Sequence, residues 1–235
     1  MKLIIIIFTI LLLLALWDLY PTLNDIGLRY LLGKSYLQTN GSLNAHFKNL
    51  DTIIENSHDF EGHTACCKSK IKFINEVLQK YRPKRVCEIG FNGGHSASIF
   101  LSDKNVKHLH SFDLCDHKYS QKSIEYIKKN FKNRFSLTCG DSTKTVPKYN
   151  GQKFDLVFID GGHYNDIPNQ DIINTLAHLA NPGALIMMDD THYSYLISFF
   201  TNHSVDKYWN RAINYKMIKP IKTIPGLSLG MATGK

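Results

Sequence analysis

The sequence lacks the motifs of several common site classes. Its glycine loop, Gly90–Gly94, has neither the Gly-Lys-Ser/Thr of a P-loop nor the Gly-x-Gly-x-x-Gly of dinucleotide-binding folds. The five cysteines form no Cys-x-x-Cys pair, so no zinc site or dithiol redox motif is expected. There is no internal repeat and no low-complexity segment beyond an apolar N-terminal run. These absences leave a single ordinary domain plus an appendage as the expected organisation.

Arginine-rich runs are also missing, although the chain is basic. Lysine and arginine number 28 against 20 acidic residues, which gives a formal net charge of +8. The lysines concentrate in Lys118–Lys132 and Lys207–Lys222. This pattern is typical of solvated helix faces, so we expect no nucleic-acid partner. An apolar fraction of 43% is enough for a real core.

The cysteines are odd in number and scattered. Cys87, Cys115 and Cys139 lie in or beside predicted strands, where a free cysteine acts as a small hydrophobic residue. Cys66 and Cys67 are adjacent. We therefore expect no disulfide framework, which favours a reducing compartment.

One long hydrophobic run is present, at the N-terminus. Leu3–Trp17 carries no charged residue, and a spanning helix needs roughly 17–25 residues. We predict an uncleaved membrane anchor over residues 1–20, contacting the membrane through residues 3–20, with the domain on the lumenal or extracytoplasmic side. The alternative is a cleaved signal and secretion, although no small-x-small cleavage site follows. Residues 21–62 are predicted to form a tether or cap with a short helix at Leu43–Ile54, and residues 63–235 one α/β domain.

Predicted helices and strands alternate from Arg85 onwards. Strands are expected at Val86–Ile89, Leu109–Asp113, Phe135–Thr138, Phe154–Asp160 and Ala184–Asp189. Helices are expected at Thr64–Tyr81, Ser96–Leu101, Ser120–Phe131 and Asn169–Leu179, with Asn181-Pro182-Gly183 as a turn and two closing strands within Ile213–Met231. The pattern predicts a Rossmann-like, doubly wound α/β fold: a mainly parallel seven-stranded sheet with an antiparallel C-terminal hairpin.

The stretch Arg85–Ser96 organises this domain. A short buried strand is followed by Glu88-x-Gly90-x-x-x-Gly94 and then by the start of a helix. Such a strand, loop and helix N-terminus suits a nucleotide-type ligand. The other strands also end in polar groups: Asp113, Gly140-Asp141-Ser142, Asp160 and Asp189-Asp190. A single strand-end aspartate is common as a helix cap, but five polar strand ends in one chain indicate a ligand site.

Region Arg85–His192 resembles the class I S-adenosylmethionine-dependent methyltransferases, and looks closest to small-molecule O-methyltransferases of the catechol and macrolide-sugar type. The resemblance rests on the glycine loop, the acidic end of the second strand and the fourth strand, Phe-Asp-Leu-Val-Phe-Ile-Asp. It implies a donor site for S-adenosylmethionine: Glu88, Gly90, Asn92 and Gly94 around the methionine, Ser96 at its carboxylate, Asp113 at the ribose, and Asp141 and Ser142 at the adenine. Asn92 departs from the family, in which many members have glycine.

The same resemblance implies a metal site. Metal-dependent members carry acidic residues at the ends of the fourth and fifth strands, which here are Asp160, Asp189 and Asp190. Hard oxygen ligands suit Mg²⁺ or another divalent cation, which would bind a substrate hydroxyl and lower its pKa. In the alternative, Asp190 caps the next helix, and only Asp160 and Asp189 face the site.

In the catechol-type family the catalytic base follows the aspartate at the end of the fourth strand, and the matching residue here is His163. The resemblance implies that His163 would accept the hydroxyl proton and that Asp160 is the second catalytic residue. His163 could instead bind the metal or a backbone group, and His192 is a second candidate.

The predicted activity is metal-assisted O-methylation of a hydroxyl on a small molecule, sugar or glycan. Two alternatives stay open: a metal-free N-methyltransferase acting on protein or RNA, and an inactive binding protein with the same fold.

Overall fold

A computed structural model describes residues 41–54, 67–192 and 205–234, together with Thr9, Leu12, Leu13, Leu16 and Thr64. The predicted anchor over residues 1–20 lies outside the described residues except for four of them, so it stays a prediction. Within the described part, no helix has both the length and the apolar character to cross a membrane.

Seven strands make up one sheet. They are β1 (Arg85–Ile89), β2 (His108–Asp113), β3 (Phe135–Cys139), β4 (Phe154–Ile159), β5 (Ala180–Asp189), β6 (Ile218–Ile224) and β7 (Leu227–Ala232). The helices are α3 (Gly41–Ile54), α4 (Lys68–Tyr81), α5 (His95–Ser102), α6 (Ser120–Asn130), α7 (Ser142–Thr145), η3 (Val146–Lys148), α8 (Ile167–Asn174), η4 (Thr175–Leu179) and α10 (Val205–Asn214).

The strand order is β3-β2-β1-β4-β5-β7-β6. Strands β1 to β5 are parallel, while β7 runs antiparallel to both β5 and β6. This confirms the predicted doubly wound sheet with its antiparallel C-terminal hairpin. The order reverses between β1 and β4, and ligands of open α/β sheets bind at such a point, beyond the carboxyl ends of the strands.

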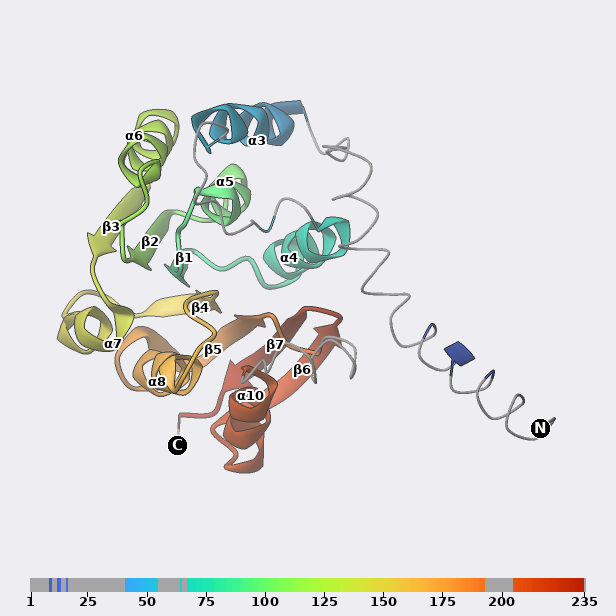
Figure 1. Ribbon diagram of the computed structural model, residues 1–235. Helices are drawn as coiled ribbons and strands as arrows, with labels where there is room; N and C mark the ends of the chain where they lie inside the picture. Colours follow the sequence, from blue (N-terminus) through green and yellow to red (C-terminus); the bar gives the residue numbers. More distant parts are fainter. Residues whose placement is uncertain are drawn as a thin grey trace.

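Two hydrophobic cores lie on opposite faces of the sheet, and Figure 1 shows α3 to α6 on one face and α7, α8 and α10 on the other. Alternate residues of one strand enter different cores, as the two-residue repeat of a strand requires: Val86 packs toward α4 and α5, and Cys87 toward α8 and α10. In β5, Leu185 and Met187 face the α4 side. The same alternation assigns Asp189 to that side.

Two predicted boundaries are wrong. Asn181-Pro182-Gly183 was expected as a turn, but it lies inside β5, where the register with β4 shifts. Proline and a glycine at φ +80° fit there because the segment is an exposed bulge. The closing strands begin at Ile218 rather than Ile213, because α10 extends to Asn214.

The expectation about cysteines is also corrected. Cys115 and Cys139 form a disulfide, with Cα atoms 5.5 Å apart. Strands β2 and β3 are neighbours, and Asp113 pairs with Cys139, so a residue just beyond β2 comes beside the end of β3. Cys67 and Cys87 are buried free thiols.

Candidate functional site

The glycine loop after β1 packs directly on the segment after β4. Gly90 has φ +95°, and a Cβ atom there would lie 1.9 Å from the carbonyl oxygen of Asp160. The Gly90 N–H donates to Phe112 O at 2.8 Å, and the Asp160 N–H donates to Ile89 O at 2.8 Å. Only glycine fits this position, so the loop and the carboxyl end of β4 are held as one unit.

Asp113, the predicted ribose ligand, holds the glycine loop in place. Its Oδ2 accepts from the backbone N–H groups of Phe91 at 2.9 Å and Asn92 at 2.8 Å. Its Oδ1 accepts from Cys115 N at 2.7 Å. The structure therefore brings Asp113 and the loop together as predicted from the strand ends, while its contact with a ribose stays a prediction.

The Asn92 departure from the family pattern has a conformational reason. Asn92 has φ +46°, a left-handed conformation that asparagine tolerates better than most residues. Its Oδ1 accepts a hydrogen bond from the hydroxyl of the buried Tyr119. Gly94 follows with φ +83°, and a Cβ there would lie 2.8 Å from the Phe91 ring. The loop is thus shaped before any ligand binds.

Glu88 and Ser96, both predicted to contact the methionine part of the donor, contact each other. Glu88 is fully buried, and its two carboxylate oxygens accept from the hydroxyls of Ser96 and Ser111. Burial raises the pKa of Glu88 to about 7, and the two serine hydrogen bonds oppose this rise. The strand therefore carries a carboxyl group that titrates near neutral pH.

The two predicted adenine residues have different surroundings. Asp141 caps α7, accepting from Thr143 N at 3.0 Å, and forms an ion pair with Lys144 at 2.8 Å. Ser142 donates to Oδ1 of Asp171 at 2.7 Å. Asp171 is fully buried, and burial raises its pKa to about 6. Sequence reasoning missed Asp171, because an aspartate inside helix α8 gives no sign in the sequence that it is buried and bound to Ser142.

A cluster of charged side chains occupies the carboxyl ends of β4 and β5. Single donor atoms of Asp160, His163 and Asp190 lie within 4.8 Å of one another, an arrangement that suits a metal ion. His163 Nε2 is 3.0 Å from Asp190 Oδ2 and 4.0 Å from Asp160 Oδ1. The predicted metal set was Asp160, Asp189 and Asp190; the structure gathers Asp160 and Asp190 with His163 instead.

Asp189, the third predicted ligand, is not one of these three donors and pairs with a lysine. The Lys70 ammonium is 2.7 Å from Asp189 Oδ1 and 3.5 Å from Asp190 Oδ1. Sequence reasoning missed Lys70. A signal did exist, because Lys70 lies four residues before Ile74 on the apolar stripe of α4, where a lysine must find a buried partner.

The charges in the cluster shift one another's protonation. Burial raises the pKa of Asp160 well above its usual value, and the charges of Asp189 and Asp190 raise it further. Burial lowers the pKa of His163, but the hydrogen bond and charge of Asp190 outweigh that effect, so the net pKa is raised. Three carboxylates this close favour the binding of a cation.

His192, the second candidate for a base, lies outside the cluster. Its side chain is exposed, and its backbone N–H donates to Asp206 Oδ1 at 2.7 Å. The structure therefore gives His163, rather than His192, the contacts expected of a site histidine.

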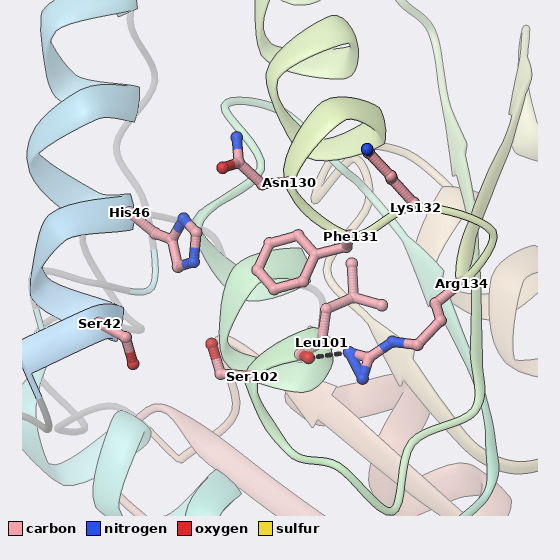
Figure 2. A pocket seen from close by; sticks show the side chains of 8 residues that line it. All are labelled: Ser42, His46, Leu101, Ser102, Asn130, Phe131, Lys132 and Arg134. Carbon is pink, nitrogen blue, oxygen red and sulfur yellow. Dashed lines mark hydrogen bonds between the residues drawn. The ribbon is translucent and has the colours of Figure 1, made fainter.

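The described residues also form a hollow of about 350 Å³ between α3, α5 and α6. Figure 2 shows its lining: Ser42, His46, Leu101, Ser102, Asn130, Phe131, Lys132 and Arg134. Helix α5 starts after β1 and ends at this hollow, and Arg134 precedes β3, so the hollow lies at the amino edge of the sheet. It contains no predicted site residue.

Comparison with known proteins agrees with this geometry. Residues 87–191 match a family described as a methyltransferase domain. No curated protein matches the chain. Among solved structures, the S-adenosylhomocysteine-bound methyltransferase PaMTH1 of Podospora anserina is 17% identical, with a TM-score of 0.59, covering 85% of this chain and 99% of that one.

Two O-methyltransferases show the same fold. TomG of Streptomyces achromogenes, solved with S-adenosylmethionine and involved in tomaymycin synthesis, is 17% identical, with a TM-score of 0.61 and coverage of 89% and 95%. An O-methyltransferase of Bacillus cereus in complex with S-adenosylhomocysteine is 14% identical, with a TM-score of 0.58 and coverage of 83% and 92%. Residues 87–191 of this chain thus match a methyltransferase domain, within the fold that these solved methyltransferases share.

Proposed function

We propose that this enzyme transfers the methyl group of S-adenosylmethionine to a hydroxyl oxygen of a small molecule, assisted by a divalent cation. The observation that carries the proposal is the group of Asp160, His163 and Asp190, whose donor atoms lie within 4.8 Å of one another beside the glycine loop. PaMTH1 and TomG, with their bound S-adenosylhomocysteine and S-adenosylmethionine, support the donor. The small-molecule context of TomG supports the acceptor class, and the comparisons give no support for a glycan.

The donor set fits a hard divalent cation. Asp160 and Asp190 supply carboxylate oxygens and His163 an imidazole nitrogen, a combination that binds Mg²⁺ or Mn²⁺. A bound cation supplies a Lewis acid that holds the acceptor hydroxyl and lowers its pKa. The His163 nitrogen that faces Asp190 Oδ2 at 3.0 Å is Nε2, so this nitrogen would be the one to bind the cation.

The chain's own residues position the reactants for an in-line displacement at the methyl carbon. The glycine loop, fixed by Asp113, offers the donor surface, and the acidic cluster lies beyond β4, to which Gly90 is packed. Holding the donor and the acceptor next to each other in this way provides much of the rate enhancement.

Donor binding and turnover test the proposal separately. Calorimetric titration of S-adenosylmethionine into the full chain, in mild detergent with Mg²⁺, is expected to show one site. Asp113→Asn should weaken that binding at least about tenfold, because the loop loses its carboxylate support. Asp116→Asn, which changes an exposed carboxylate three residues away, serves as the matched control.

Formation of S-adenosylhomocysteine from S-adenosylmethionine, with a panel of catechols and other hydroxylated aromatics as acceptors, reports the reaction. Asp190→Asn is expected to abolish this formation while the donor still binds. A chelator should stop the wild type, and added Mg²⁺ should restore it. Activity that persists in the chelator would mean that no cation is needed and that His163 acts as the base, as predicted from the sequence. Absence of donor binding would refute the proposed function as a whole.

A further inference from the structure

Asp160, Asp189 and Asp190 form an acidic cluster at the ends of β4 and β5. Among the described residues, Lys70 is the one positively charged side chain that reaches this cluster from outside the loops at the strand ends. It lies on α4 and is 7% exposed. The ammonium contacts Asp189 at 2.7 Å and Asp190 at 3.5 Å. A charged amine in a buried position is stable only when its charge is compensated, so the pairing with Asp189 is part of the fold.

The lysine divides the carboxylates into two sets. Asp190 faces both ways, with Oδ1 toward Lys70 and Oδ2 toward His163. Asp189 has its ion pair with Lys70 and does not belong to the group that suits a metal ion, although it is adjacent to Asp190 in the chain. Strand alternation explains why, since the Asp189 side chain leaves β5 on the face that α4 covers.

We propose that Lys70 is a positioning residue that sets the composition and charge of the cation site. By holding the Asp189 carboxylate, it limits the site to Asp160, His163 and Asp190, and it offsets one of three negative charges. The inference rests on the proposed function, because it requires a divalent cation at this cluster.

A charge count gives the consequence. Three carboxylates and one ammonium leave a net charge of −2 when the imidazole is neutral, which a divalent cation balances. Without the ammonium the net charge is −3, and Asp189 becomes available as a fourth ligand. Removing Lys70 should therefore tighten divalent cation binding, whereas a lysine that only anchored α4 would leave binding unchanged or weaker when lost.

The experiment measures Mn²⁺ binding to the full chain by calorimetry at pH 8, with the folded state checked by circular dichroism. Lys70→Met, which keeps the side-chain length and loses the charge, should bind Mn²⁺ roughly tenfold more tightly than the wild type. Lys70→Arg, which keeps the charge, should remain within about twofold. Unchanged or weaker binding by folded Lys70→Met would overturn the inference.

A second set of variants covers the case in which Lys70→Met does not fold. The pair Lys70→Met with Asp189→Asn keeps the wild-type net charge of −2 and should stay within about twofold of the wild type, because it does not touch the three donors. Asp189→Asn alone lowers the net charge to −1 and should weaken Mn²⁺ binding by no more than about tenfold. A large loss of Mn²⁺ affinity in Asp189→Asn would make Asp189 a ligand and refute the inference. Wild-type protein that binds no Mn²⁺ would instead refute the metal part of the proposed function, and the Lys70 inference with it.

Discussion

The two sides of the sheet's carboxyl edge satisfy their polar groups in different ways. Beside β1 and β2, the carboxylates of Glu88 and Asp113 accept hydrogen bonds from serine hydroxyls and backbone N–H groups. Beside β4 and β5, the carboxylates of Asp160, Asp189 and Asp190 face one another, with Lys70 and His163 as the nearby cations. Hydrogen bonds within the chain satisfy the carboxylates of the first side, whereas the second side keeps a net negative charge that a bound cation can neutralise.

This difference suits a two-substrate enzyme. A donor that is the same in every turnover is served by a rigid, internally bonded loop. An acceptor that must lose a proton is served by a site whose electrostatics respond to what binds.

Gly90 is where the two sides meet, and its substitution should have the largest effect. In Gly90→Ala the new Cβ would overlap the Asp160 carbonyl oxygen at 1.9 Å while φ stays at +95°. Backbone, not a flexible side chain, is the obstacle, so we expect a loss of more than about 4 kcal/mol of unfolding free energy, or no folded protein. Urea unfolding followed by circular dichroism measures it.

Gly183→Ala is the matched control. Gly183 has φ +80°, but a Cβ there has no neighbour within 4 Å. Only the backbone strain remains, with an expected cost of about 1–2 kcal/mol. Equal losses for the two substitutions would show that the contact between β1 and β4 does not depend on Gly90.

Much of the fold could be predicted because local signals and the overall topology agree. The predicted strands start or end within one residue of β1 to β4, and Pro83 ends α4 as expected. The failures are non-local. The bulge at Asn181–Gly183 uses turn residues inside a strand, and the Cys115–Cys139 disulfide depends on which strands are neighbours, which cysteine spacing alone does not reveal.

The site was predicted from strand ends, and this worked for position but not for partners. Asp160, His163 and Asp190 do come together, since parallel strands end at one edge. The apolar stripe of α4 indicates that Lys70 needs a buried partner, but that the partner is Asp189 follows from the packing of α4 over β5, which the sequence does not reveal. The burial that raises the pKa of Glu88 and Asp171 likewise depends on tertiary packing.

The pH dependence of stability tests the donor side. The folded Glu88 has a pKa of about 7 against an ordinary 4.5, so between these pH values the folded state binds a proton that the unfolded state has lost. Stability from this group is therefore highest at low pH and falls as the pH rises toward 7, by about 3 kcal/mol in all. Glu88→Gln should remove that decline, as measured by urea unfolding at pH 5 and pH 8.

The control for Glu88→Gln is Glu125→Gln, at an exposed carboxylate on α6. The unfolding free energy of Glu125→Gln should vary with pH in parallel with that of the wild type. All other titrating groups are the same in both proteins, so their contributions cancel in the difference. If Glu88→Gln also ran parallel, the buried carboxylate would have an ordinary pKa, and the contrast between the two sides would lose its electrostatic basis.

Loss of His163 should affect the acceptor side alone. His163→Gln removes the group that faces both Asp160 and Asp190, and kcat is expected to fall about 100-fold, or about 2.7 kcal/mol. The dissociation constant of S-adenosylmethionine, measured by calorimetry, should not change. His178→Gln, at a half-buried histidine of η4, should leave both quantities unchanged. A donor affinity that fell together with kcat would mean that the two sides are not separable.

Recovery of His163→Gln at high Mn²⁺ distinguishes a ligand from a base. A weakened cation site is refilled by mass action, so activity should rise with Mn²⁺ concentration if His163 is a ligand. A rate that stays about 100-fold low at saturating Mn²⁺ would assign the imidazole to proton transfer.

The disulfide tests the donor side with the smallest expected effect. Cys115 donates its backbone N–H to Asp113, and its bond to Cys139 fixes that segment to the end of β3, next to the loop predicted to bind adenine. Replacing both cysteines by serine opens a loop with a sequence separation of 24, for which we expect a loss of about 2 kcal/mol of unfolding free energy. Donor affinity should fall about threefold, because Asp113 keeps its contacts to Phe91 and Asn92.

The cation site should not respond to this change, since the bridge lies beside β2 and β3 while the acidic cluster lies beyond β4 and β5. Mn²⁺ titration of the double serine variant, and of the wild type with and without a reducing agent, measures this directly. Equal Mn²⁺ affinities with a weaker donor would sharpen the division of the edge into two sides. A Mn²⁺ affinity that fell with donor affinity would instead show that strain at β3 is transmitted through β1 to β4, and the edge would then act as a single site.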